Sequence, residues 1–198
     1  MTPIRDRSSR VIGVEIRSVA EAPELVAGAG ELFREYEQSL GVDLRFQGFD
    51  AELAGLPGAY APPSGCLLVA VAADQPVACV GLRRLDAHTA ELKRLYVRPR
   101  WRGRGLGREL VTRVLDVARE LQYRRIVLDT LPSMHEAQRL YELFGFVDAR
   151  AYYKNPLPGV RFMQLDLDVN ARRGRSSLAS PKAARAGSAG EPDHGGGR

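Results

Sequence analysis

Residues 97–107 have the sequence Val-Arg-Pro-Arg-Trp-Arg-Gly-Arg-Gly-Leu-Gly and connect an apolar run, Leu92 to Val97, to a periodic segment that begins near Gly105. Three glycines at alternate positions let the backbone turn tightly and point its N–H groups outward. A helix that starts here adds unpaired amides and partial positive charge, and the neighbouring arginines add charged donors. The stretch therefore predicts a strand–loop–helix unit that binds a small molecule carrying a pyrophosphate.

Two common phosphate-binding loops do not fit this stretch. A P-loop requires Gly-Lys-Ser/Thr after its glycines, whereas Gly107-Arg108-Glu109 stands here. A dinucleotide-binding loop requires G-x-G-x-x-G, and the glycines at 103, 105 and 107 have a different spacing. What is present is R-x-x-G-x-G over residues 102–107, preceded by Val97-x-Pro99. Taken alone, this pattern is also compatible with a basic, glycine-rich surface turn.

A second motif lies downstream of the loop. Residues 125–130, Arg-Ile-Val-Leu-Asp-Thr, predict a buried strand. They are followed by A-x-x-L-Y-x-x-x-G-F over residues 137–146, which predicts a short helix capped by Gly145. In this order and spacing, the loop and the second motif resemble the GNAT acetyltransferase superfamily, whose loop binds acyl-CoA. The ending, residues 152–159 followed by 162–167, is similar to the final strand pair of many members, so the resemblance covers residues 11–168.

The resemblance implies an α/β fold: a single-domain, GNAT-like architecture with a mixed, twisted sheet of about six or seven strands flanked by about four helices. Hydrophobic periodicity predicts strands and helices in an interspersed order that agrees with this fold. Strands are expected over residues 11–19, 65–73, 77–85, 91–97, 125–130 and 162–167, and helices over 22–40, 50–56, 105–121 and 137–145.

The expected strand 91–97 contains a break in its alternation. The apolar phase is even at Leu92 and odd at Leu95 and Val97, and the polar pair Lys93-Arg94 stands where the phase changes. A β-bulge shifts the register in this way. By resemblance, such a bulge splays this central strand from its neighbour and opens a slot for the pantetheine arm of CoA. An amphipathic edge strand with ordinary polar residues is the alternative.

Length and charge limit the class of protein. We expect a flexible N-terminus at 1–10, one domain at 11–168 and a disordered tail at 169–198 that is rich in Ala, Gly, Ser and Arg. The tail from 171 holds six basic and two acidic residues and the first ten residues hold three and one, so residues 11–170 carry −1 of the formal net charge of +5. This balance argues against a nucleic-acid-binding domain. Locally, Lys93 to Arg108 holds seven basic and no acidic residues, which suits a nucleotide with several phosphates.

Membrane, metal and thiol chemistry find little support in the sequence. The longest apolar run, Cys66 to Ala73, is far shorter than the roughly 20 residues of a membrane helix. The start of the chain has no apolar secretory segment, so we expect a cytoplasmic protein. Cys66 and Cys79 fall in apolar runs and are expected to be buried free thiols rather than a disulfide or a catalytic thiol. No Cys/His cluster has metal-ligand spacing, so no metal is expected.

The resemblance implies an acetyl-CoA-dependent N-acetyltransferase in which an amine attacks the thioester carbonyl directly within a ternary complex. Glu91 is the expected general base, and Tyr141 is the expected acid that protonates the leaving thiolate. A backbone amide at or beside Leu95 is expected to hold the thioester oxygen as charge develops. Expected contacts to CoA are Leu95, Tyr96 and Val97 along the acyl and pantetheine arm, and Arg102, Gly103, Arg104, Gly105, Leu106, Gly107 and Arg108 at the pyrophosphate.

These roles have structural alternatives. Glu91 is also suited to a surface ion pair with Lys93 or Arg94, and Tyr141 to packing on a helix face. The chain departs from the family pattern at Met134, where many members carry an Asn that contacts the cofactor. Either Ser133 takes over that contact or the contact is missing, and the departure bears on cofactor affinity more than on fold.

Two other functions stay open at this level. A non-catalytic acyl-CoA-binding or regulatory module would keep the loop, although the presence of both Glu91 and Tyr141 favours an enzyme. A nucleic-acid-binding protein would use the basic loop and tail, but the charge of the domain and the lack of a stacking-aromatic pattern argue against it. The acceptor is a small-molecule, amino-acid or peptide amine whose site we expect between residues 33–49 and 152–159. A homodimer, common in the superfamily, stays open.

Overall fold

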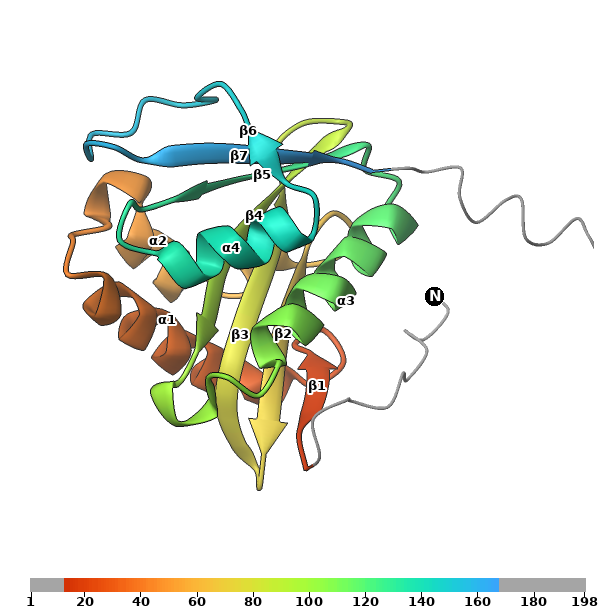
Figure 1. Ribbon diagram of the computed structural model, residues 1–198. Coiled ribbons are helices and arrows are strands. Elements are labelled where there is room, and N and C mark those ends of the chain that lie inside the picture. Colours follow the sequence, from red (N-terminus) through yellow and green to blue (C-terminus); the bar gives the residue numbers. More distant parts are fainter. Residues whose placement is uncertain (1–12, 168–198) are drawn as a thin grey trace, which may run out of the picture.

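A computed structural model describes residues 13–167 of the chain. Within this range seven strands form one sheet in the order β1-β2-β3-β4-β5-β7-β6 (Figure 1). All neighbouring strands are antiparallel except β4 and β5, which are parallel. The strands are β1 (Glu15–Ser18), β2 (Cys66–Ala72), β3 (Gln75–Arg84), β4 (Thr89–Val97), β5 (Arg125–Thr130), β6 (Val147–Asp148) and β7 (Arg161–Asp166). The predicted mixed α/β sheet is confirmed.

Four α-helices of the described range cover the two faces of this sheet, α3 and α4 on one face and α1 and α2 on the other (Figure 1). They are α1 (Val26–Leu40), α2 (Phe49–Ala54), α3 (Leu106–Glu120) and α4 (His135–Leu143). Short 3₁₀ turns occur at Pro23–Leu25, Arg45–Gln47, Gly58–Tyr60 and Pro99–Trp101. The expected terminal segments, 1–10 and 169–198, lie outside the described residues.

The core consists of two apolar clusters, one on each face of the sheet, because successive strand residues point to opposite sides. In β2, Leu68 and Ala70 pack in the cluster with α3, whereas Leu67 and Val69 pack in the cluster with α1. Helix α3 closes the first cluster through apolar residues at three- and four-residue spacing. Those residues are Leu106, Leu110, Val111, Val114, Leu115, Val117 and Ala118, all buried.

Several predicted boundaries shift in the structure. The expected helix 22–40 divides into a 3₁₀ turn at Pro23–Leu25 and α1, which ends where Gly41 takes a left-handed φ of 64°. The expected final strand pair from 152–159 and 162–167 is wrong in its first member. Strand β7 pairs instead with the two-residue strand β6, and 152–159 is a loop that contains two prolines, which donate no ladder hydrogen bond.

The predicted bulge in the central strand is confirmed. Cys79 of β3 lies opposite Tyr96 of β4, but Gly81, two residues on, lies opposite Lys93, three residues back. The extra residue falls at Arg94, whose φ is 58°. On its other side β4 pairs with β5 only as far as Glu91 and Val127. Beyond that point the two parallel strands separate, and the separation defines the candidate site.

Candidate active site

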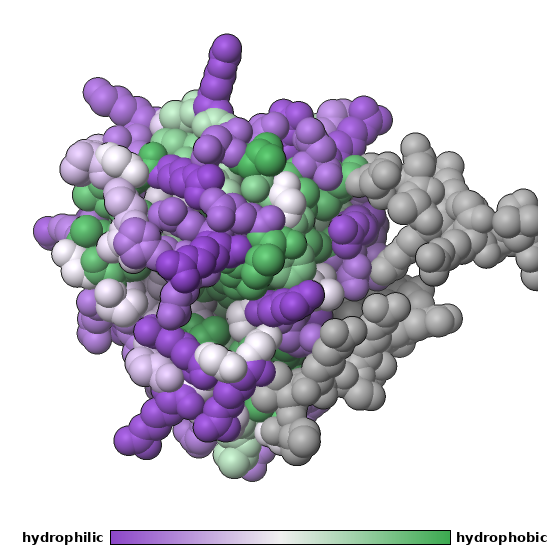
Figure 2. All heavy atoms as spheres, viewed as in Figure 1, coloured by the Kyte–Doolittle hydropathy of each residue, from purple (hydrophilic) through white to green (hydrophobic). Residues whose placement is uncertain are grey.

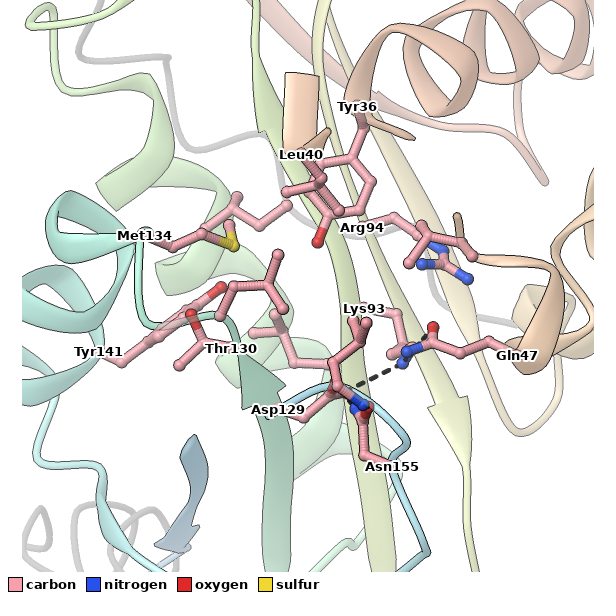
Figure 3. A pocket seen from close by; sticks show the side chains of 15 residues that line it. Tyr36, Leu40, Gln47, Lys93, Arg94, Asp129, Thr130, Met134, Tyr141 and Asn155 are labelled. Carbon is pink, nitrogen blue, oxygen red and sulfur yellow. Dashed lines mark hydrogen bonds and ion pairs between the residues drawn. The ribbon is translucent and has the colours of Figure 1, made fainter. Parts of the chain in front are cut away.

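The pocket of interest lies between the separated ends of β4 and β5. Strand β4 contributes Leu92 to Leu95, and the last two residues of β5 together with Leu131 form the other wall. Tyr36 of α1 and Tyr141 of α4 complete it from the two faces of the sheet, so all the layers of the fold meet here (Figure 3). The remaining lining residues are Leu40, Leu44, Gln47, Met134, Asn155 and Leu157.

Arg94 anchors the bulge to helix α2. Its guanidinium donates to both carboxylate oxygens of Glu52, at 2.9 and 2.7 Å, and lies over the rings of Phe49 and Tyr36. Glu52 also accepts a hydrogen bond of 2.6 Å from the Tyr60 hydroxyl. Burial alone would raise the pKa of Glu52, but the hydrogen bonds and charge of Arg94 outweigh it and hold that pKa below its ordinary value. The left-handed residue that bends β4 is therefore fixed by a buried ion pair.

Glu91 is buried behind the pocket rather than on its wall. Its side chain is only 1% exposed. One oxygen accepts from Arg83 at 2.6 Å, the other accepts from the Tyr152 hydroxyl at 2.8 Å, and the Lys93 ammonium lies 3.5 Å away. The alternative was a surface ion pair of Glu91 with Lys93 or Arg94. The contact with Lys93 is present but buried, and Arg94 pairs with Glu52 instead, so the surface pair is wrong. The catalytic role of Glu91 stays a prediction.

Asp129, the penultimate residue of β5, is the carboxylate that lines the pocket. One of its oxygens accepts from the Lys93 ammonium at 3.1 Å, and the other accepts from the Tyr153 hydroxyl at 2.9 Å and the Asn155 amide at 3.3 Å. Lys93 also donates to Gln47 at 3.1 Å (Figure 3). Sequence reasoning missed this group. The signal was a charged residue that directly follows the apolar run 126–128, inside the predicted buried strand.

Tyr141 reaches the pocket from α4 and is almost wholly buried. Its ring packs against Phe146, with the ring centroids 5.6 Å apart. Burial raises the pKa of Tyr141 well above its ordinary value, so its hydroxyl keeps its proton at neutral pH. Met134, the residue at the N-cap of α4, lines the same pocket beside it.

The glycine-rich loop takes the conformation its sequence predicts. Gly103 and Gly105 have φ values of 71° and 85°, in the left-handed region that favours glycine, and α3 begins at the next residue, Leu106. No side chain caps the helix at Gly105, so the amides of its first turn are open to a ligand. A Cβ on Gly107 would lie 3.4 Å from Leu140 of α4, which brings the two helices close at this point.

The arginines of the loop have different neighbours. Arg102 donates to the Val97 carbonyl at 3.0 Å and lies over the Tyr96 ring. Arg104 lies 4.9 Å from the centroid of the Trp101 ring. Both arginines are exposed apart from these contacts. Figure 2 shows hydrophobic surface in the middle of the face that carries α3 and α4, bordered by hydrophilic side chains.

Only part of the predicted site lies on this pocket, because Tyr96, Val97 and residues 102–108 are not among its lining residues. Leu95 and Tyr141 line one pocket, and the loop that leads into α3 follows directly from β4. The ring of Tyr96 packs edge-on against Tyr36, with centroids 6.2 Å apart, and Arg102 of the loop lies over the same ring.

Comparison with known proteins decides the family. The sequence profile of the acetyltransferase (GNAT) family matches residues 27–146, which span the helix α1, the bulged strand, the loop and Tyr141. The chain belongs to the GNAT family. It is 40% identical over 154 residues to an uncharacterized N-acetyltransferase of Schizosaccharomyces pombe, with 76% of this chain and 93% of that protein covered. The protein is thus an acyltransferase of the N-acetyltransferase type.

Other relatives extend the GNAT comparison. The N-acetylaspartate synthetase of Rattus norvegicus is 37% identical over 100 residues, which cover 50% of this chain and 33% of that protein. Among solved structures, an acetyltransferase of Streptococcus agalactiae matches with a TM-score of 0.66 and 25% identity, over 79% of this chain and 99% of the other. A GNAT acetyltransferase of Elizabethkingia anophelis with acetyl-CoA bound shares the fold, with a TM-score of 0.54, 18% identity, and 79% and 99% coverage.

Other features of this GNAT chain bear on the site only indirectly. Cys66 and Cys79 are buried free thiols, and burial raises the pKa of Cys66 to about 12, which leaves it unreactive at neutral pH. Between residues 13 and 167, no three His, Cys, Asp or Glu side chains form a group that could hold a metal ion. No helix of that same range is long and apolar enough to cross a bilayer.

Proposed function

We propose that this GNAT protein transfers an acetyl group from acetyl-CoA to a primary amine by direct attack in a ternary complex. The observation that carries the proposal is the separation of β4 from β5 beyond Glu91 and Val127, next to the open first turn of α3. A slot between strands suits an extended chain such as pantetheine, and a helix N-terminus beside it suits a pyrophosphate. The acetyl-CoA in the Elizabethkingia neighbour supports this choice of donor.

In this proposal the donor runs along the strand and ends at the loop. Leu95, Tyr96 and Val97 contact the acyl and pantetheine arm, partly through their backbone. The segment 102–107 holds the pyrophosphate through amides and guanidinium groups, with Arg108 beside it. The left-handed φ values of Gly103 and Gly105 support this assignment, because they turn the chain into α3 without a side chain in the way.

The chemistry requires two proton transfers. An alkyl amine with a pKa of about 10.4 is mostly protonated at neutral pH, so a base must take its proton before or during attack on the carbonyl carbon. Glu91 is the proposed base, and Asp129 is a second candidate because it lines the pocket. As the carbon–sulfur bond breaks, its electron pair stays on sulfur and Tyr141 supplies the proton. The place of Tyr141 on the pocket wall supports this last role, and its raised pKa means only that the proton is present at neutral pH.

The choice of base is testable with matched amides. If Glu91 takes the proton, Glu91→Gln removes the acidic limb of the pH–rate profile and Asp129→Asn keeps it. The reverse result transfers the role to Asp129. An unchanged profile in Glu91→Gln overturns the assignment of Glu91.

The acceptor is proposed to be a small amine, with amino acids first among the candidates. The similarity to the N-acetylaspartate synthetase of Rattus norvegicus supports an amino acid, because that protein's name specifies acetylation of aspartate. The acceptor would approach from the α1 and α2 face, where Tyr36 and Asp129 meet the pocket (Figure 3). Aspartate, other amino acids, simple alkyl amines and short peptides form the first screen.

A thermal melt tests the donor. Acetyl-CoA at about 100 times its Kd stabilises a protein by about 2.7 kcal/mol, which raises Tm by roughly 5–10 °C for a chain of this size. NAD and ATP serve as controls for nonspecific nucleotide binding, and thiol release during the amine screen then measures turnover. A shift with acetyl-CoA alone supports the proposal, whereas no shift at millimolar acetyl-CoA overturns it. A shift without thiol release from any amine supports the non-catalytic module instead.

A further inference from the structure

Thr130 carries a polar atom with no protein partner. Of all buried side-chain nitrogen and oxygen atoms in residues 13–167, the Thr130 hydroxyl oxygen alone lacks a hydrogen bond. Thr130 as a whole residue is only 3% exposed. A buried hydroxyl left unpaired is costly, and such groups in folded proteins call for a specific reason.

Thr130 lies on the wall of the slot between β4 and β5. Figure 3 shows it on the same side of the pocket as Tyr141 and Met134. Because side chains alternate along a strand, Thr130 points to the face opposite Asp129 and to the same face as Leu128, which packs in the cluster with α3. The unpaired hydroxyl is therefore on the donor side of the sheet, away from the proposed acceptor side.

The level of Thr130 along the slot follows from the strand register. Glu91 and Val127 form the last pair of the parallel ladder, and two residues further Lys93 still reaches Asp129 at 3.1 Å. One more residue places Thr130 level with Arg94, at the bulge. This is the end of the slot where the thioester would lie if Leu95 holds its oxygen, so the hydroxyl faces the reacting end of the donor.

We propose that the Thr130 hydroxyl donates a hydrogen bond to the sulfur of the bound acyl donor, a contact that strengthens as the sulfur becomes a thiolate. The inference rests on the proposed function, since it needs CoA in the slot. In the reaction the amine nitrogen bonds to the carbonyl carbon, the carbon–sulfur bond breaks, and the electron pair stays on sulfur. Tyr141 then gives its proton to sulfur, while Thr130 keeps its own and acts as a second donor.

The test compares CoA with desulfo-CoA, in which hydrogen replaces the thiol, and needs no acceptor. Calorimetric Kd values are measured from about pH 7 to about pH 9.5, a range in which a free thiol of pKa about 8.5 becomes a thiolate. Protein groups facing the slot are Tyr36 from α1, Lys93 and Arg94 from β4, Asp129 from β5 and Tyr141 from α4. Their effects on the rest of CoA are common to both ligands, so the ratio of the two Kd values isolates the sulfur, and comparison of the wild type with Thr130→Val isolates the hydroxyl.

In the wild type we expect CoA to gain affinity over desulfo-CoA as the pH rises. In Thr130→Val, which keeps the shape and removes the hydroxyl, that gain is about tenfold smaller, and Thr130→Ser restores it. Ligand-free Thr130→Val should melt at or above the wild-type temperature, because it no longer buries an unpaired hydroxyl. A purely structural hydroxyl would predict the opposite change in melting temperature.

Three results would contradict the assignment. An equal gain in Thr130→Val and wild type overturns the sulfur contact, and so does a ligand-free Thr130→Val that melts several degrees lower. Equal weakening of both ligands in Thr130→Val moves the contact to another atom of CoA and also overturns it. If the wild type binds neither ligand, the proposed function itself fails. That result differs from one in which the wild type binds CoA and Thr130→Val leaves the binding unchanged, which overturns only the role of Thr130.

Discussion

A single oxygen atom separates tyrosine from phenylalanine, and at position 141 that atom lies in the pocket between the separated strands. We expect Tyr141→Phe to lower kcat by about a hundredfold, because loss of a positioned general acid leaves the thiolate unprotonated as it departs. Burial raises the pKa of Tyr141 far above neutrality, so the wild type should show no loss of rate from Tyr141 ionisation at moderately alkaline pH. Thiol release with a saturating amine measures both effects.

Tyr123→Phe is the matched control for Tyr141→Phe. Tyr123 is also buried, but its hydroxyl donates to the Ser64 carbonyl at 2.7 Å, in a different part of the fold. Its loss should cost about 1 kcal/mol of stability and leave kcat unchanged. Full turnover in Tyr141→Phe would remove Tyr141 from the mechanism.

At this scale the sequence predicted residue types better than their surroundings. Tyr141 lines the pocket as expected because a motif with fixed spacing carries it, and Leu95 does so two residues before the motif that begins at Val97. The burial of Glu91 and the pairing of Lys93 with Asp129 were not foreseen, because each depends on which residues of β4 and β5 lie side by side. That register is a tertiary property, and a single sequence contains no local signal for it.

At the scale of the elements, a substitution of Gly105 tests whether the start of α3 binds the donor. Gly105 has a φ of 85°, and an added Cβ would meet no atom within 4 Å, so Gly105→Ala is strained only through its backbone. We expect it to lower the free energy of unfolding by about 1–2 kcal/mol. Because the loop must also shift to relieve that strain, we expect acetyl-CoA to bind at least tenfold more weakly, measured by calorimetry.

Gly41→Ala supplies the comparison for Gly105→Ala. Gly41 ends α1 with a φ of 64° and has equally open surroundings, so its substitution costs similar stability away from the loop. Acetyl-CoA affinity should stay at the wild-type value in Gly41→Ala. Equal loss of affinity in both variants would mean that general destabilisation, and not the loop, explains the effect.

The ion pair between Arg94 and Glu52 joins the bulge of β4 to helix α2, so the free energy of unfolding should depend on the ionisation of Glu52. Glu52→Gln leaves the buried Arg94 without its charge partner and should cost about 3 kcal/mol near neutral pH. The pKa of Glu52 is lowered in the folded state. The stability it contributes is therefore complete above the ordinary Glu pKa of about 4.3 and is lost as the pH falls through the lower folded-state value.

Denaturant unfolding of wild type and Glu52→Gln across this pH range measures that contribution. The difference between them should be largest near pH 7 and shrink below the folded-state pKa of Glu52. Glu24→Gln, which breaks the exposed pair with Arg17, should change stability by less than about 1 kcal/mol at any pH. A difference that grows on acidification would contradict the assignment of Glu52 to the paired, charged state.

The long helices and strands could be predicted because their hydrophobic periodicity is strong, whereas the short strand was missed because its local signal is weak. The expected strand 125–130 matches β5, and α3 begins one residue after Gly105. Strand β6 has only two residues, Val147–Asp148, which is too short for any alternation to show in the sequence. It exists because β7 offers it a free edge, a tertiary cause that propensity does not encode.

At the scale of the whole molecule, the number of basic residues in a stretch of sequence differs from the number of positive charges that stay available to a ligand after folding. The seven basic residues from 93 to 108 suggested a concentrated positive patch. The fold pairs three of them with acids from distant segments, Lys93 with Asp129, Arg94 with Glu52 and Arg98 with Glu35. The other four form no ion pair within the described residues 13–167. They are Arg100, Arg102, Arg104 and Arg108.

This division predicts how salt acts on donor binding. The Kd of acetyl-CoA should rise severalfold between about 50 mM and about 500 mM NaCl, because exposed charges are screened beyond a Debye length of roughly 10 Å at 0.1 M and less at higher salt. Arg104→Gln should weaken binding at low salt and flatten this dependence. Arg98→Gln should instead lower stability, because Arg98 donates to Glu35 at 2.7 Å and to the Pro76 carbonyl at 2.6 Å, and leave the salt dependence as it is. If both variants flatten it equally, the paired arginine also meets the ligand, and the division of the patch into structural and binding charges is wrong.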